Sequence, residues 1–509
     1  MFFTKSLYRI VRIFTLLFLP ASFCSAASLS LSPDAGPPKS LVTLTGSGFM
    51  PLETVDILIN SKPFSKATAD GLGDFTVEAR VPRLAQPGSY TVKAVGETSG
   101  STAQQTFDVA TDWPMFKGGP ARVGVNLAEN TINPGNAIFL NPSWEGIMGD
   151  IVDYSSPAVV DGIVYVGSFD GRLYAFDANG CEAEFCNPLW SGSTGNDIIS
   201  SPAVANGVVF IGSADHNLYA FAANGCGGNS TCLPLWTGAT GSAILQGSPV
   251  VAAGVVYVGS GDNKLYAFKA AGCGKSSCQP LWTGSTKGHV YSPPAVSAGV
   301  VYVGSTDGIL YAFDAKGCGK ASCAPLWTGK TGAMISESGP AVSHGVVYIG
   351  SFDRFLYAFD ATGCGKSTCQ PLWKGETMDA IESSPSIANG VVYVGSDDAA
   401  LYTFPAAGCG QDICQPTWKG GAIGEQAAIV SAPTIANGLV YVGENDGNVL
   451  VFNADGCGQF FCLTLTQLRA NNEQIVSSTP AVVNGTVYFG SADQNNAPIG
   501  RLYVYKLFR

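Results

Sequence analysis

A segment of about 46 residues recurs along most of this chain, and no other feature limits its possible folds as strongly. One copy reads PLWTGSTKGHVYSPPAVSAGVVYVGSTDGILYAFDAKGCGKASC. Short runs rich in Val, Tyr and Phe alternate with hairpin-turn pairs such as Asp161-Gly162 and Asp170-Gly171. Each copy therefore predicts four short strands. In the first full copy these are Ala158–Val160, Ile163–Gly167, Leu173–Asp177 and Pro188–Trp190.

Three residue types mark equivalent positions in the copies, and each has a structural explanation. The tryptophans are predicted to pack between adjacent units, with Leu465 in the eighth position. They are Trp144, Trp190, Trp236, Trp282, Trp327, Trp373 and Trp418. The prolines of an SP segment are Pro157, Pro202, Pro249, Pro294, Pro340, Pro385, Pro433 and Pro480. The aspartates of the following turn are Asp170, Asp215, Asp262, Asp307, Asp353, Asp398, Asp446 and Asp493. We expect these aspartates to accept hydrogen bonds from backbone N–H groups, since one carboxylate per turn is too few for calcium.

Four-stranded units of this length favour an all-β fold, an eight-bladed β-propeller over residues 144–509. The structural rival is a solenoid, which would need distinct polar caps at both ends. The last copy stops after its third strand, Leu502–Leu507, while an extra strand at Ser143-Trp144 precedes the first copy. Pairing of these two segments would close the ring and leave no open edge. Residues 111–143 form a lead-in segment.

Fourteen cysteines outside the N-terminal leader fall into local pairs, which indicates disulfides in an oxidising compartment. Zinc is disfavoured because the spacing is wrong and only His216, His289 and His344 exist. The predicted disulfides are Cys181–Cys186, Cys226–Cys232, Cys273–Cys278, Cys318–Cys323, Cys364–Cys369, Cys409–Cys414 and Cys457–Cys462. Each joins the end of a third strand to the start of a fourth.

Residues 1–26 read as a cleaved signal peptide, with a basic start, an apolar run at Ile13–Leu19 and small residues at Ser25 and Ala26. Lipidation at Cys24 is disfavoured because Phe23 precedes it, where a small residue is expected. No stretch is long enough to span a bilayer. The predicted location is the periplasm or the cell exterior. A net charge of −11 argues against nucleic acid as a partner.

Residues 28–110 lack cysteine and tryptophan and alternate in the manner of a small immunoglobulin-like β-sandwich. The pattern VTLTGSGFMPLETVDILI…ADGLGDFTVEARVP…GSYTVKAVG resembles the IPT/TIG modules of exported bacterial proteins. This resemblance implies a spacer or adhesive module before the propeller.

The repeat SPAVxxGVVYVGSxDGxLYAFDA…PLW resembles the PQQ-like propeller repeat, and DWPMFKGGPARVGVN at 112–126 resembles its lead-in. The family includes quinoprotein alcohol dehydrogenases and the propeller of the outer-membrane assembly machinery. In the dehydrogenases, adjacent cysteines, a tryptophan and a Glu/Asn/Asp set surround the quinone and calcium. This sequence has no adjacent cysteines, and every tryptophan except Trp113 belongs to the repeat series. We therefore expect no catalytic residues, no metal and no cofactor, with a divergent dehydrogenase holding pyrroloquinoline quinone and calcium as the alternative.

A binding site is expected where the variable loops between the Trp strand and the SP segment gather at one end of the central channel. The candidate residues of this mouth are Asp197, Lys287, His289, Tyr291, Glu337, Asp379, Glu382, Glu425 and Glu473. Solvated loops are the plain alternative; a cation, sugar or peptide site is the functional one. The predicted function is an exported binding or scaffolding protein of the cell envelope that contacts a protein or glycan. An outer-membrane assembly scaffold is a further hypothesis, which the missing lipid signal weakens.

Overall fold

The computed structural model describes residues 26–228, 230–422, 427–470, 476–491 and 500–507. Residues 1–25 of the predicted signal peptide lie outside these residues, as do Glu425, Glu473 and Asp493. The chain divides into two compact units, residues 1–109 and 110–509. No helix among the described residues is long and apolar enough to cross a membrane.

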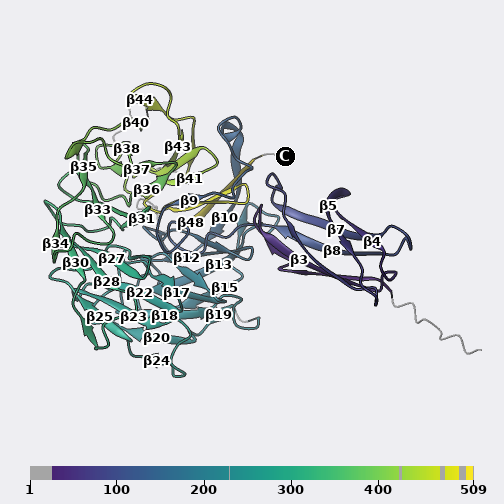
Figure 1. Ribbon diagram of the computed structural model, residues 1–509. Helices are drawn as coiled ribbons and strands as arrows, with labels where there is room; N and C mark the ends of the chain where they lie inside the picture. The colour runs from purple at the N-terminus through teal and green to yellow at the C-terminus, as the bar shows by residue number, and fades with distance from the viewer. Residues whose placement is uncertain (1–25, 229, 423–426, 471–475, 492–499, 508–509) are drawn as a thin grey trace, which may run out of the picture. The chain divides into compact units, whose positions relative to one another are not determined.

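The first unit is a sandwich of two β-sheets (Figure 1). One sheet holds, in spatial order, β1 (Ser28–Ser32), β3 (Leu41–Ser47) and β6 (Phe75–Arg80). The other holds β2 (Ala35–Gly36), β8 (Thr102–Val109), β7 (Gly88–Gly96), β4 (Thr54–Ile59) and β5 (Lys62–Thr68). Alternate residues such as Val42, Leu44, Val55 and Ile57 point inward and form the core between the sheets.

The second unit is a succession of antiparallel sheets with a propeller-like arrangement (Figure 1). The strands of each sheet are given from inner to outer. The first two sheets hold β11 (Ala158–Val160), β12 (Ile163–Ser168), β13 (Arg172–Asp177), β15 (Trp190–Ser193) and β19 (Thr231–Cys232), and then β16 (Ala203–Ala205), β17 (Val208–Gly212), β18 (Asn217–Ala222), β20 (Trp236–Ala239) and β24 (Ser277–Cys278). The next two hold β21 (Val250–Ala252), β22 (Val255–Ser260), β23 (Lys264–Lys269), β25 (Trp282–Ser285) and β29 (Ser322–Cys323), and then β26 (Ala295–Ser297), β27 (Val300–Ser305), β28 (Ile309–Asp314), β30 (Trp327–Lys330) and β34 (Thr368–Cys369).

The remaining sheets follow the same plan, with changes at the end of the chain. They are β31 (Ala341–Ser343), β32 (Val346–Gly350), β33 (Phe355–Asp360), β35 (Trp373–Glu376) and β39 (Ile413–Cys414); β36 (Ser386–Ala388), β37 (Val391–Ser396), β38 (Ala400–Pro405), β40 (Trp418–Gly421) and β44 (Phe461–Leu463); β9 (Val125–Asn126), β41 (Thr434–Ala436), β42 (Leu439–Gly443), β43 (Asn448–Asn453) and β45 (Thr466–Arg469); and β46 (Ala481–Val483), β47 (Thr486–Ser491), β48 (Arg501–Leu507), β10 (Leu140–Ile147) and β14 (Phe185–Cys186). A short 3₁₀ helix, η1 (Ala137–Phe139), precedes β10.

The second strand of each sheet is buried along most of its length, because neighbouring sheets cover both of its faces. In β22, for example, every residue after Val255 is buried. This explains why these strands read as continuous runs such as VVYVGS instead of alternating apolar and polar residues. The predicted fourth strand Pro188–Trp190 needs a correction: pairing starts at Trp190 and continues to Ser193. Pro188 precedes the ladder, since proline has no N–H to donate.

The succession of sheets closes on itself through the strand that precedes the repeats. Strand β10 pairs antiparallel with β48, with Trp144 opposite Val504 and Gly146 opposite Leu502. This confirms the predicted pairing of the Trp144 segment with the C-terminal strand. Inner strands contact one another in order, and β46 contacts β11 in turn. The closure is also held by a hydrogen bond of 2.8 Å from the Thr479 N–H to the Ser156 hydroxyl.

Candidate functional site

The repeated tryptophans lie between adjacent sheets. The ring of Trp190 is 6.1 Å from Tyr165 in its own sheet and 6.5 Å from Phe221 in the next. The same tyrosine hydroxyl donates to the carbonyl of Ala223, across the same boundary, at 2.9 Å. Aromatic burial and this hydrogen bond account for the tryptophan and tyrosine of the repeat without a ligand.

The seven predicted disulfides are all formed, with Cα–Cα distances of 5.6 to 5.7 Å. Their loops also bridge neighbouring sheets, which the sequence did not reveal. Cys278 lies opposite Gly238 in a parallel pairing with the outer strand of the preceding sheet. The N–H of Thr237 donates to the carbonyl of Ser276 in that loop at 2.8 Å. The disulfide loops therefore cover outer edges that would otherwise be open.

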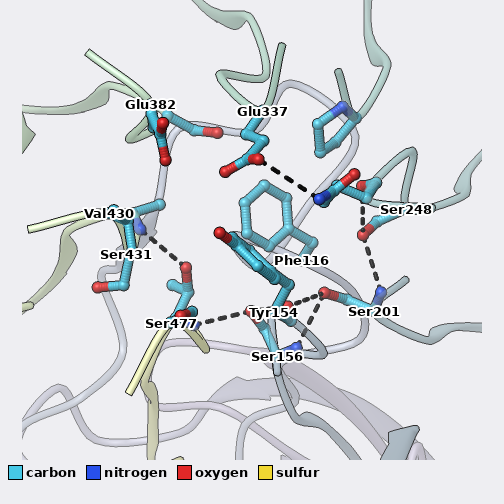
Figure 2. Close-up of a pocket in the computed structure, with 15 residues that line it drawn as sticks. Phe116, Tyr154, Ser156, Ser201, Ser248, Glu337, Glu382, Val430, Ser431 and Ser477 are labelled. Carbon is cyan, nitrogen blue, oxygen red and sulfur yellow. Dashed lines mark hydrogen bonds between the residues drawn. The ribbon is translucent and has the colours of Figure 1, made fainter. Parts of the chain in front are cut away.

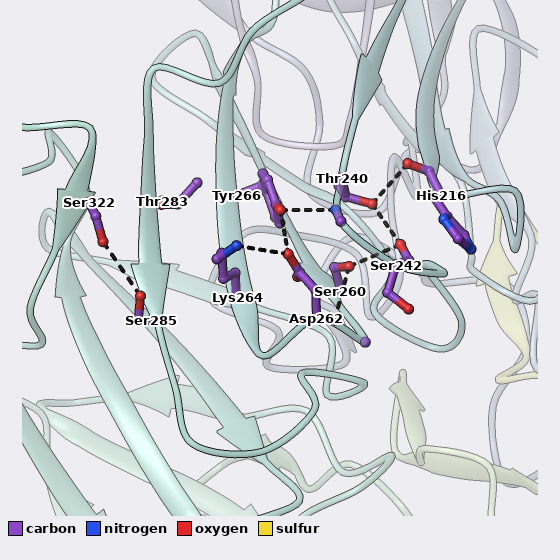
Figure 3. A network of polar contacts seen from close by, with 12 residues as sticks. His216, Thr240, Ser242, Ser260, Asp262, Lys264, Tyr266, Thr283, Ser285 and Ser322 are labelled. Carbon is purple, nitrogen blue, oxygen red and sulfur yellow. Dashed lines mark hydrogen bonds and ion pairs between the residues drawn. The ribbon is translucent and has the colours of Figure 1, made fainter.

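The described aspartates of the repeat hydrogen-bond within their own sheet, and the tyrosine they bind also reaches the loop of the preceding sheet, as Figure 3 shows for Asp262. Its Oδ2 accepts hydrogen bonds from the Tyr266 hydroxyl at 2.6 Å and from Lys264 Nζ at 3.1 Å. The same tyrosine oxygen accepts from the Gly241 N–H at 3.0 Å. Asp446 has no such tyrosine; it accepts from the backbone N–H and the side-chain amide of Asn448. These contacts give the described aspartates of the repeat a structural role.

The lead-in segment runs along the inner strands and closes the channel from within. Its backbone accepts hydrogen bonds from successive inner strands, among them Val204 N–H to Pro114 at 2.7 Å and Val342 N–H to Ala121 at 2.8 Å. The Arg122 guanidinium is fully buried and donates to the carbonyl of Pro249 at 2.8 Å. Burial lowers the pKa of Arg122 to about 9, and its carbonyl partners satisfy its donors. The segment therefore forms the floor of a blind channel.

A ring of hydroxyl groups lies above this floor and links consecutive sheets. The N–H of Ser156 donates to the Ser201 hydroxyl at 2.9 Å, and the N–H of Ser201 donates to the Ser248 hydroxyl at 2.8 Å. On the other side of the closure, the Ala432 N–H donates to Thr479 Oγ1 at 2.9 Å. The serine of the SP segment thus links adjacent sheets through hydrogen bonds.

Two carboxylates stand over this ring and form the wall of a small pocket at the channel mouth (Figure 2). Glu337 and Glu382 face the Tyr154 hydroxyl, with Phe116 of the lead-in segment among the lining residues. Gln246 Nε2 donates to Glu337 Oε1 at 3.4 Å. The pocket has a volume of about 30 Å³, enough for a few water-sized groups.

The electrostatics of the pocket favour a proton or a cation beside the carboxylates. Burial and the neighbouring Glu382 raise the pKa of Glu337 to about 8. Burial also raises the pKa of Glu382 and of Asp153. Burial, followed by the charge of Glu382, raises the pKa of Asp397 to about 7. Carboxylates this close to one another, in a pocket with room for only a few waters, are stabilised by any positive charge that enters the pocket.

The structure brings only part of the predicted mouth together. Glu337 and Glu382 line the pocket, whereas the other described candidates do not. These are Asp197, Lys287, His289, Tyr291 and Asp379. The ring of His289 stacks on Tyr291 at 5.2 Å, and its Nδ1 lies 2.5 Å from the carbonyl oxygen of Gly261, so this pair is engaged within the loops.

Sequence reasoning missed Tyr154, Gln246, Val430 and Ser477, all of which line the pocket. Their distance in sequence from the repeated prolines could have identified them. Each stands three residues before a repeated proline, as Glu337 and Glu382 do. Because the repeat holds that position at the channel axis, variation there changes the pocket and leaves the sheets intact. Among the described residues, no three His, Cys, Asp or Glu side chains are grouped to hold a metal ion.

Comparison with known families agrees with this architecture. Residues 90–226, 233–320 and 319–502 match the family described as outer membrane protein assembly factor BamB. The chain belongs to this BamB family. Residues 26–109 match the macroglobulin-like domain, so the immunoglobulin-like character of the first unit is supported, and the IPT/TIG likeness remains a prediction. No curated protein sequence matches the chain.

Solved structures of the BamB fold and of quinoproteins resemble the chain. BamB from Moraxella catarrhalis is 18% identical, with a TM-score of 0.53 over 72% of this chain and 97% of that one. Quinohemoprotein alcohol dehydrogenase from Comamonas testosteroni is 14% identical, with a TM-score of 0.59 over 77% and 80%. A europium-containing methanol dehydrogenase is 14% identical, with a TM-score of 0.58 over 78% and 98%. At these identities the likeness shows the propeller fold alone.

Proposed function

We propose that this chain is an exported, non-catalytic binding protein of the bacterial cell envelope, and that a protein partner inserts a basic side chain into the channel mouth. We also propose that its second unit is a ring of eight blades over residues 144–509, preceded by a lead-in at 111–143 and a sandwich spacer at 28–110. The sheet order and the β10–β48 pairing support the ring.

The observation that carries the binding function is the blind acidic pocket. Its volume of about 30 Å³ suits the tip of a lysine or arginine side chain, and ligand pockets for larger molecules are commonly about 300–1,000 Å³. Glu337 and Glu382 supply the charge, and the hydroxyl ring with Gln246 supplies further hydrogen-bond partners. A buried carboxylate pair that meets a guanidinium regains the stabilisation that burial removes.

The quinoprotein alternative rests on the fold shared with two dehydrogenases. The residues of this pocket do not fit the quinone. Phe116 is an aromatic lining residue, but the space of about 30 Å³ beside it is far smaller than a fused three-ring cofactor. The fourteen cysteines among the described residues are all paired within local loops away from the pocket lining. We therefore derive no reaction for this chain.

An envelope location follows from the predicted signal peptide and is consistent with the disulfides, which persist in oxidising compartments. The family name, outer membrane protein assembly factor, favours a protein partner over a glycan. The first unit would then act as a spacer that holds the propeller at a distance from its point of attachment.

The test is in-cell photo-cross-linking from the exposed loop that leads to the pocket. A photoreactive amino acid replaces Met334, whose side chain is 41% exposed in the loop that precedes Glu337. We expect one cross-linked partner, joined through a peptide that contains lysine or arginine, and loss of the cross-link in the Glu337→Gln, Glu382→Gln double variant. The control is Asp197→Asn, a carboxylate of an equivalent loop that does not line the pocket. Cross-linking that persists in the double variant would refute the proposal.

A further inference from the structure

A second concave site lies on the periphery of the propeller unit, between the sheets of β35 and β40. This groove has a volume of about 300 Å³, and its lining includes Arg354, Met378, Tyr402, Lys419 and Phe460. Phe460 belongs to the loop closed by the Cys457–Cys462 disulfide, so its position is fixed covalently. We call these five residues the basic groove.

Lys419 occupies a position held by threonine in three other outer strands, at 237, 283 and 328, and by lysine in one, at Lys374. There the threonine hydroxyl donates to a carbonyl of the disulfide loop, as Thr283 does to Ala321 at 3.2 Å. Lys419 keeps the backbone hydrogen bond to its loop but cannot make the hydroxyl contact. The fold therefore accepts threonine at this position, and the lysine is not needed to build the sheet.

Two departures from the repeat meet Lys419 in the same groove. Met378 stands where other copies have glycine, at 195, 241 and 332, and it is 68% exposed. Phe460 stands where other copies have serine or alanine, at 276, 321 and 367, and it is 56% exposed. Because exposed apolar side chains add nothing to packing, the repeat itself gives no reason for them. Their convergence points to a ligand.

The charge of the groove indicates what that ligand carries. Lys419 Nζ lies 5.6 Å from the centre of the Tyr402 ring and 3.7 Å from Met378 Sδ. Neither Lys419 nor Arg354 forms an ion pair with another described residue. One carboxylate, Glu376, also lines the groove, which leaves it with a net positive charge on a chain whose overall charge is −11.

We propose that the basic groove binds an acidic peptide segment of a partner protein. A large apolar side chain of the segment lies between Met378 and Phe460, and a neighbouring carboxylate pairs with Lys419 and Arg354. Apolar contact supplies affinity, and charge complementarity supplies selection against basic segments. This site is separate from the channel mouth and does not depend on the function proposed for it.

The test is a selection from a displayed library of random heptapeptides on the immobilised full chain. The reference variant carries Lys419→Thr, Met378→Gly and Phe460→Ser, which are residues that the same fold holds in its other copies. We expect enriched peptides with Asp or Glu beside an aromatic or large aliphatic residue. Synthetic versions should bind the triple variant at least tenfold more weakly and lose affinity as salt rises.

The control is the Glu337→Gln, Glu382→Gln variant, which should bind the same peptides as well as the unaltered chain. Retention of the urea midpoint of tryptophan fluorescence establishes that the triple variant is folded. Enriched peptides without acidic residues, equal binding to the triple variant, or a selection with no convergent sequence would each overturn the proposal. The channel-mouth cross-link should survive in the triple variant, so that the two proposals can fail separately.

Discussion

Replacing Glu337 by glutamine should stabilise the propeller unit by an amount that grows as the pH rises from about 4.5 to about 8. In the folded protein, burial and Glu382 raise the pKa of Glu337 from its ordinary 4.5 to about 8. Between these two pH values the folded chain holds a proton that the unfolded chain has lost. The unaltered protein therefore loses stability as pH rises through this range, and the loss is complete above about pH 8. Glutamine does not titrate and escapes that loss.

The magnitude follows from the size of the pKa change. From 4.5 to about 8, at about 1.4 kcal/mol per pKa unit, the gain is bounded at about 5 kcal/mol. Water entering the open pocket and movement of Glu382 reduce it, and we expect about 1–2 kcal/mol above pH 8. For a unit of this size that gain raises the urea midpoint by a few tenths of a molar unit.

Urea unfolding followed by tryptophan fluorescence measures this change in the propeller unit alone, because all eight tryptophans lie in residues 110–509. Midpoints are compared at pH 5 and pH 9 with the disulfides intact. Asp197→Asn, outside the pocket, should shift the midpoint equally at both values. A Glu337→Gln midpoint that matches the unaltered protein at pH 9, or a gain of the same size at pH 5, would show that the pocket does not hold a buried carboxylate pair.

Three other outcomes are expected. Trp236→Ala should cost about 3–5 kcal/mol in unfolding free energy, because Trp236 is 4% exposed and its ring lies between Phe210 and Phe268. Trp236→Leu should cost clearly less, because leucine keeps part of the buried apolar area; equal losses would contradict inter-sheet packing by the indole. The predicted equivalence of Leu465 to these tryptophans was wrong, since Thr466 pairs with Val451 as Trp236 pairs with Ala220. Replacing Cys318 and Cys323 together by serine should lower the urea midpoint by less than the equivalent of about 3 kcal/mol. The opened loop should also be cleaved by trypsin at Lys320, which mass spectrometry detects. A loop that resists trypsin would mean that its parallel pairing holds without the disulfide. Asn484→Ala should destabilise the propeller unit, because the Asn484 side chain accepts a hydrogen bond from the Thr111 N–H at 2.8 Å and donates one to the Thr111 carbonyl at 3.0 Å. An unchanged urea midpoint would show that other contacts hold the lead-in segment.

The repeat allowed most of the fold to be predicted from the sequence, because the repeat period, the turn residues and the cysteine spacing are local features. The pairing of the Trp144 segment with Leu502–Leu507 could be predicted because each end of the array lacks what the other supplies. The disulfide loops were paired correctly, but their parallel contact with the preceding sheet was missed. That contact involves only two residues, such as Ser277 and Cys278, which is too short to leave a pattern in the sequence.

The site was harder to predict than the fold. Loop position alone cannot tell which side chains reach the channel axis, so Lys287 and His289 were grouped with Glu337 although only the glutamate lines the pocket. The role of the lead-in segment also could not be read, because Lys117 and Arg122 are basic residues that look solvated. The carbonyl oxygens that accept hydrogen bonds from these two side chains belong to Pro385 and Pro294, far away in sequence.

The seam between β10 and β48 sets the order in which this protein can mature. Local bridges such as Cys318–Cys323 can form as soon as a single hairpin emerges, whereas the circle needs residues near both ends of the array. A chain cut short before Arg501 would leave β10 without its antiparallel partner, whatever the quality of its other sheets. Completion of the final strand is thus the step that separates a string of oxidised hairpins from a finished molecule, and it gives the cell a single point at which unfinished copies differ from complete ones.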